Sequence, residues 1–189
     1  MSLIKLKNNA LDNLTSFEGS ASLGDMVLIS SAVASASSSI EFTLGDYKEY
    51  KFFFVNMHPS VDGQSLLFNA SIDNGSNYNV IKTTTYFSSQ HDEANTVAQL
   101  TYLTGADRAE SASDQTIIRG IGGDSDQAGC GYLHLFNPSS TTYVKHFINC
   151  GNSAYSTNYS DQAFSAGYFN TTSALTNVIF KHSTGNIDD

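Results

Sequence analysis

The sequence predicts an all-β protein: an antiparallel β-sandwich of jelly-roll type, preceded by an extended N-terminal arm. Short apolar or alternating segments recur between turn-forming residues, whereas the most helical stretch, residues 106–114, is short. Tyr and Phe supply the 12 % aromatic content, and only 2 residues are proline, a composition that favours strands. Helices do not alternate with the strands, as a parallel sheet would require. At 189 residues, the chain is long enough for one domain with a substantial core.

We expect residues 1–39 to form the arm and residues 40–189 to form the sandwich. Residues 30–39, SSAVASASSS, are small and polar. Such a stretch is typical of an exposed linker, or of an extended arm whose small side chains pack closely. The apolar arm residues that we expect to contact neighbouring subunits are Leu3, Ile4, Leu6, Met26, Val27 and Ile29.

The first strands are predicted from their apolar patterns. Residues 40–44 alternate apolar and polar side chains, as in a half-buried strand. Residues 50–57, YKFFFVNM, are apolar on both faces, which predicts a central strand covered on both sides. Further strands are expected at 66–72, 80–87, 97–103 and 117–121.

Residues 131–148 predict a β-hairpin around the turn Asn-Pro-Ser-Ser at 137–140. Proline suits the second position of a type I turn, and asparagine suits the first. A hairpin centred on this turn places Cys130 opposite Cys150 and His134 opposite His146. It also puts Leu133 on the same face as Phe147.

The rest of the chain predicts a polar loop over 150–162, which holds Tyr155 and Tyr159, and strands at 163–170 and 175–182. Residues 183–189 have turn chemistry. No strand follows them, so we expect the edge of the preceding strand to be completed by a neighbour or by further chain.

Charge and hydropathy limit the classes of partner. The net charge of −9 argues against nucleic acid, whose phosphates need a basic surface. No segment approaches the roughly 20 apolar residues of a membrane helix, and residues 1–9 lack the apolar stretch of a signal peptide. We therefore expect a protein made in the cytosol that does not insert into membranes.

Candidate chemical sites are weak. Cys130 and Cys150 could form a disulfide, although a cytosolic origin favours free thiols. The loop 123–129, GDSDQAG, begins like a calcium loop but lacks the further oxygen ligands of an EF-hand. The positions of His134 and His146 are more typical of a cross-strand packing pair than of a metal site or pH sensor. No catalytic motif is present. We expect no enzyme activity, no cofactor and no metal.

Residues 133–147, LHLFNPSSTTYVKHF, and 167–188, GYFNTTSALTNVIFKHSTGNID, carry a family resemblance. Together with residues 40–59 they resemble small virion proteins of tailed bacteriophages, of the type common in marine phages. The resemblance covers about three quarters of the chain, and it implies a jelly-roll or β-sandwich module. Chains of this family continue after the GNID turn with a closing strand, so we expect this sequence to stop short of it.

The resemblance implies a non-enzymatic structural protein of the virion, assembled in the host cytoplasm. We expect it in the tail or tail fibres, anchored to other virion proteins by its arm, and homo-oligomeric because virion positions are symmetric. A head decoration protein that stabilises the capsid is the alternative. A carbohydrate or receptor-binding module is a further one, in which Tyr155 and Tyr159 contact a host surface glycan.

Overall fold

The computed structural model describes residues 26–188. The chain divides into two units, Met1–Ser31 and Ala32–Asp189, and the second unit contains the sandwich. The predicted contact residues Leu3, Ile4 and Leu6 lie outside the described residues. Residues 26–33 have no regular secondary structure, and the side chains of Met26, Val27 and Ile29 are exposed.

The described residues contain no helix. Their strands are β1 (Ile40–Thr43), β2 (Glu49–Pro59), β3 (Gln64–Ser71), β4 (Lys82–Asp92), β5 (Ala98–Tyr102), β6 (Gln115–Ile121), β7 (Gly129–Phe136), β8 (Lys145–Tyr155), β9 (Tyr159–Phe169), β10 (Asn177–His182) and β11 (Ile187–Asp188).

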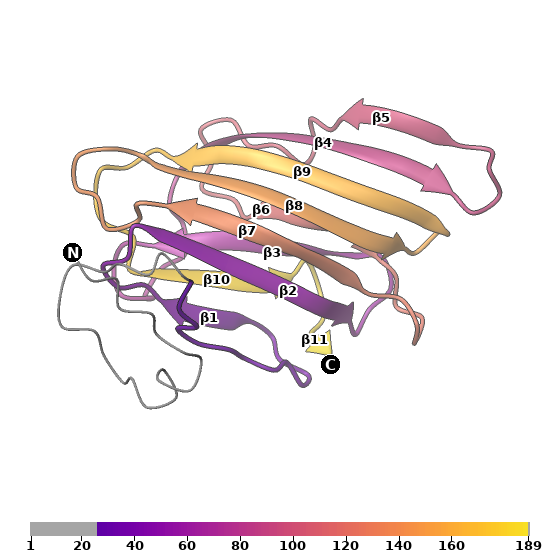
Figure 1. Ribbon diagram of the computed structural model, residues 1–189, viewed down its shortest axis with the longest axis horizontal. Coiled ribbons are helices and arrows are strands. Elements are labelled where there is room, and N and C mark those ends of the chain that lie inside the picture. The colour runs from indigo at the N-terminus through magenta and orange to yellow at the C-terminus, as the bar shows by residue number, and fades with distance from the viewer. Residues whose placement is uncertain (1–25, 189) are drawn as a thin grey trace, which may run out of the picture. The chain divides into compact units, whose positions relative to one another are not determined.

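The strands form two antiparallel layers (Figure 1). One layer has the order β1-β10-β3-β6. The other has the order β2-β7-β8-β9-β4-β5, with β11 on the free side of β2. Because β1 to β4 pass alternately between the layers, the order is that of a jelly roll in which the β8–β9 hairpin is inserted between β7 and β4. The predicted all-β antiparallel sandwich is confirmed.

The core between the layers has an apolar part and a polar part. Phe68 packs edge-on against Phe147 and Phe169 and stacks on Phe180, with ring centroids 5.4–5.6 Å apart. Toward β4 and β9 the buried inner-face residues are instead mostly polar: Lys82, Thr84, Tyr86, Ser88, Asp161 and Ser165. The side chains of Lys82, Thr84 and Asp161 have hydrogen-bond partners, whereas the buried hydroxyl groups of Tyr86 and Ser165 have none within the described residues. Polar contacts therefore specify only part of this half of the sandwich.

Strand β6 crosses β8 with a single backbone pair, Ile121 with Tyr155. Side chains of β8 supply hydrogen bonds to β6 where the backbone ladder between the two strands is missing. The Asn149 amide donates to the Ile117 carbonyl oxygen (2.7 Å), and the Ser153 hydroxyl donates to the Arg119 carbonyl oxygen (2.7 Å). These bonds satisfy β6 carbonyl groups that have no ladder partner there.

The hairpin prediction is correct in kind but wrong in register. The Ser140 amide donates to the Asn137 carbonyl oxygen, as in the predicted turn. However, β8 begins only at Lys145, so Cys130 lies opposite Asn152 and His134 lies opposite Ile148. Both cysteines are free thiols. Leu133 and Phe147 share the buried inner face, as predicted.

Three other expectations are corrected. Strand β2 is not covered on both sides, because Phe53 and Val55 are exposed on its outer face. Most of the expected loop 150–162 is the long β8–β9 hairpin, whose turn is confined to residues 156–158. The last long strand, β10, has no unpaired edge, since β1 and β3 flank it.

Candidate functional site

The outward face of the sheet β2-β7-β8-β9-β4-β5 carries a row of apolar side chains. Strand alternation sends every second residue outward, and the register aligns one such residue on each of the six strands. We call this set the aromatic row. Its members, each directly paired with the next, are Phe53, Tyr132, Cys150, Phe164, Phe87 and Tyr102.

The rings of the aromatic row are open to solvent. Phe53 is 59 % exposed, Tyr102 50 % and Phe87 41 %. Phe87 stacks on Phe164 at 5.0 Å between centroids. Val55, Leu100 and Ile148 extend the apolar surface on both sides of the row. Contiguous exposed apolar surface of this kind is typical of a contact site for another molecule.

The two ends of the row differ in charge. At the β2 end, the Lys51 ammonium lies over the rings of Tyr132 (4.3 Å to the centroid) and Phe53 (5.3 Å). At the β5 end, the Tyr102 hydroxyl donates to the Asp107 carboxylate (2.7 Å), which raises the pKa of the Tyr102 phenol. The row therefore has an ammonium group at its β2 end and a carboxylate at its β5 end.

Few other charges interrupt this face. Among the described, outward-pointing residues of these six strands, the only carboxylate is Glu49, at the margin of the face, and it lies 3.1 Å from the His134 ring nitrogen. Asp188 lies on β11, beyond the free edge of β2. In a chain of net charge −9, a wide sheet face with so few carboxylates is distinctive. The scarcity of carboxylates lowers the free energy needed to remove this face from water.

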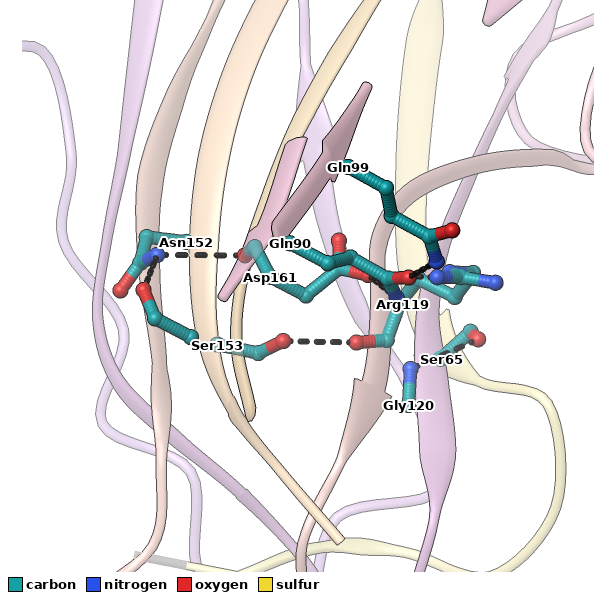
Figure 2. Close-up of polar contacts among 9 residues, drawn as sticks. Ser65, Gln90, Gln99, Arg119, Gly120, Asn152, Ser153 and Asp161 are labelled. Carbon is teal, nitrogen blue, oxygen red and sulfur yellow. Dashed lines mark hydrogen bonds and ion pairs between the residues drawn. The ribbon is translucent and has the colours of Figure 1, made fainter. Parts of the chain in front are cut away.

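A polar network joins the layers on the inner side of the same sheet (Figure 2). The Asp161 carboxylate accepts hydrogen bonds from Gln90 and from Arg119, and Gln99 donates to Gln90 (2.6 Å). Burial alone lowers the pKa of Arg119, but the hydrogen bond and charge of Asp161 outweigh it and raise the pKa. We interpret this network as structural, because it ties β4, β5 and β9 to β6.

A polar hollow of about 580 Å³ lies beside the loop 123–129 and is lined by Asn56, His58, Asp126 and Asp188. The His58 ring lies 3.3 Å from the Asp124 carbonyl oxygen. Within residues 26–188, no three His, Cys, Asp or Glu side chains are placed to hold a metal ion. The hollow is therefore a weaker candidate site than the aromatic face.

The two predicted receptor tyrosines lie at the β8–β9 turn. Their rings meet edge to face, 6.1 Å apart. Tyr155 also covers Gly120, and the Arg119 guanidinium lies 5.2 Å from its ring. Tyr159 borders a shallow hollow with Asp92 and Glu93. Tyr155 thus has a packing role, and the structure does not bring the pair together with the aromatic row.

The aromatic row was not predicted from the sequence, although one signal for it was present. Residues 50–57 are apolar on both faces, a pattern that predicts a strand buried on both sides. Such a strand can equally have one face in the core and the other face on an open contact surface. The cross-strand alignment itself depends on register, which the sequence did not reveal.

No family model, curated protein or solved structure matched the chain in comparisons with known proteins. Among the described residues, no helix has the length and apolar character needed to span a membrane.

Proposed function

We propose that this protein is a non-enzymatic structural protein of a tailed-bacteriophage particle, associated with the tail or tail fibres. The observation that carries the proposal is the exposed apolar face of the six-stranded sheet, which is suited to burial in an assembly. The family resemblance of residues 133–147 and 167–188 supports the bacteriophage assignment. A jelly-roll sandwich agrees with that resemblance.

In this proposal the chain has two contact regions. The arm anchors the protein to other virion proteins, through apolar residues that include Met26, Val27 and Ile29, which are exposed. The aromatic face supplies the second contact. Homo-oligomerisation is part of the proposal, because a symmetric particle repeats the same contact.

Immunogold labelling of intact particles of the phage that encodes the chain tests the proposal. We expect label on the tail or its fibres. Label on the head would favour the alternative, a decoration protein that stabilises the capsid. Purified particles that lack the protein altogether would contradict both assignments.

A deletion of residues 1–31 tests the anchoring role of the arm. This boundary keeps Ala34, which packs on the core, and Ser37, which pairs with Ile187. We expect the truncated protein to fold but not to enter particles. Normal incorporation of the truncated protein would show that the arm is not the anchor.

A further inference from the structure

We propose that the aromatic face binds a second copy of this chain, face to face about a two-fold axis. The proposal rests on the proposed function, since it names the partner of the same surface. A two-fold pair is the commonest arrangement of soluble homo-oligomers, and it requires a surface that is complementary to itself.

The size of the face fits such a pair. Six strands at their usual spacing are about 29 Å wide, and seven residues of strand are about 23 Å long. The face then offers on the order of 650 Å² per copy, so that a pair buries a total within the ~1,200–2,000 Å² of specific interfaces. A contact with one small ligand would leave most of this apolar surface in water.

The charges at the two ends make the face self-complementary. The midpoint of the aromatic row lies between Cys150 and Phe164 on the adjacent strands β8 and β9. A two-fold axis that passes through this midpoint, in the plane of the interface and parallel to the strands, places the β2 end of one copy on the β5 end of the other. Lys51 of each copy then lies near Asp107 of the other, and the rings of Phe53 and Tyr102 meet between copies.

The composition of the face favours binding of a like surface. Aromatic residues dominate the energetics of protein interfaces when they are fully desolvated. The Phe87–Phe164 stack lies next to the midpoint of the row, so the two-fold axis brings this stack onto the central residues of the other copy. The absence of carboxylates from the described strand residues at the centre of the face means that two copies, each of net charge −9, can approach there without direct repulsion.

Zero-length carbodiimide crosslinking of the full-length protein tests the arrangement. Within one chain, the backbones of β2 and β5 are about 24 Å apart, so a zero-length reagent cannot join Lys51 to Asp107 of the same copy. We expect a Lys51–Asp107 crosslink in the fraction whose mass by light scattering is that of two copies. Absence of this crosslink from a two-copy species would overturn the proposed arrangement.

Phe87→Asp tests the energetic role of the row. We expect it to weaken self-association by at least about 30-fold, as for an interface hot spot, in sedimentation measurements at several concentrations. Ile72→Asp is the matched control, because Ile72 is about equally exposed but lies directly after β3 in the other layer. Circular dichroism spectra establish that both variants are folded, and Tyr102→Asp provides a second test of the row if Phe87→Asp does not fold.

The outcomes distinguish this inference from the proposed function. A wild-type protein that stays monomeric at tens of micromolar, or forms a particle of another copy number, overturns the inference. If immunogold labelling still detects this protein in virions, that result would support the proposed function even though the inference is overturned. A two-copy protein with the expected crosslink but absent from virions would support the inference and contradict the function.

Discussion

Gly120 occupies a backbone position that is reserved for glycine. Its φ of +59° lies in the left-handed region, and a Cβ atom would lie within van der Waals overlap of the Tyr155 ring. Tyr155 in turn packs against Arg119. The backbone of β6 and the β8–β9 turn are thus fitted to each other at this residue.

We expect Gly120→Ala to destabilise the fold by about 2–4 kcal/mol, through both the φ value and the overlap. Urea unfolding measures the change. Gly105→Ala is the control and should stay within about 0.5 kcal/mol of the wild type, because no atom lies within 4 Å of the added Cβ atom. Equal stability of the two variants would contradict the close approach of Tyr155.

Lys82 is buried on the inner face of β4, where its ammonium group donates to the Ser113 carbonyl oxygen (2.8 Å). Burial lowers the pKa of Lys82 to about 8, against an ordinary value of 10.5, and the charge of Asp114 only partly opposes this. Between these two values the unfolded chain binds more protons than the folded chain. The free energy of unfolding therefore rises with pH in this range.

We expect the Lys82 contribution to the free energy of unfolding to rise by about 2 kcal/mol from pH 8 to pH 10. Lys145, whose pKa burial also lowers, acts in the same direction. Above about pH 10, Tyr86 opposes the rise, because burial raises its pKa and the unfolded phenol ionises first. Urea unfolding of wild type and Lys82→Met across this range isolates the contribution, and equal slopes would show that Lys82 titrates normally.

At the scale of elements, β6 is attached to β8 by two backbone hydrogen bonds around the Ile121–Tyr155 pair and, along the rest of β6, by side chains of β8. The Asn149 amide bonds a carbonyl group in the middle of β6. Loss of this donor leaves the carbonyl oxygen of Ile117 without that partner in the interior, where an unsatisfied group is costly.

We therefore expect Asn149→Leu to destabilise the protein by about 1–3 kcal/mol and to speed hydrogen exchange of β6 amides more than those of β10. His146→Gln, on the exposed face of the same strand, should leave both quantities nearly unchanged. Uniform acceleration across the sandwich would indicate that β6 does not depend on this attachment.

The strands themselves were largely predictable, because alternation and turn residues are local signals. Residues 40–44 and 117–121 were correctly assigned as strands for this reason. The pairing of Cys130 with Cys150 was wrong by two residues, since the Asn-Pro-Ser-Ser turn fixes where the chain turns but not how soon pairing begins. In the structure, residues 141–144 stay outside the ladder, so the paired residues shift.

The β8–β9 hairpin and the aromatic row were not predictable in the same way. Polar residues 150–162 resemble a loop because their strands face a polar interior on one side, where Ser153 and Asp161 are buried. The row depends on the register of six strands at once. Sequence periodicity identifies the face on which each residue lies, but not its neighbour on the next strand.

At the scale of the whole molecule, the sandwich has one sheet face that is more apolar than a solvated surface needs to be. The polar network on the inner side links this sheet to β6 in the other layer. The aromatic row spans the outer side of the same sheet. An exposed face rich in apolar side chains is suited to repeated contact between copies in an assembly. The arm supplies a separate contact in this account, so the two can be disrupted independently.

Sedimentation equilibrium of the full-length protein at several micromolar concentrations tests this account most directly. We predict a concentration-dependent transition from one chain to twice the 20.4 kDa mass of one chain, with Phe87→Asp shifted toward the single chain and Ile72→Asp unchanged. A wild-type protein that sediments as a single chain at every concentration up to about 100 μM, a range in which specific interfaces of this size form complexes, would contradict the account.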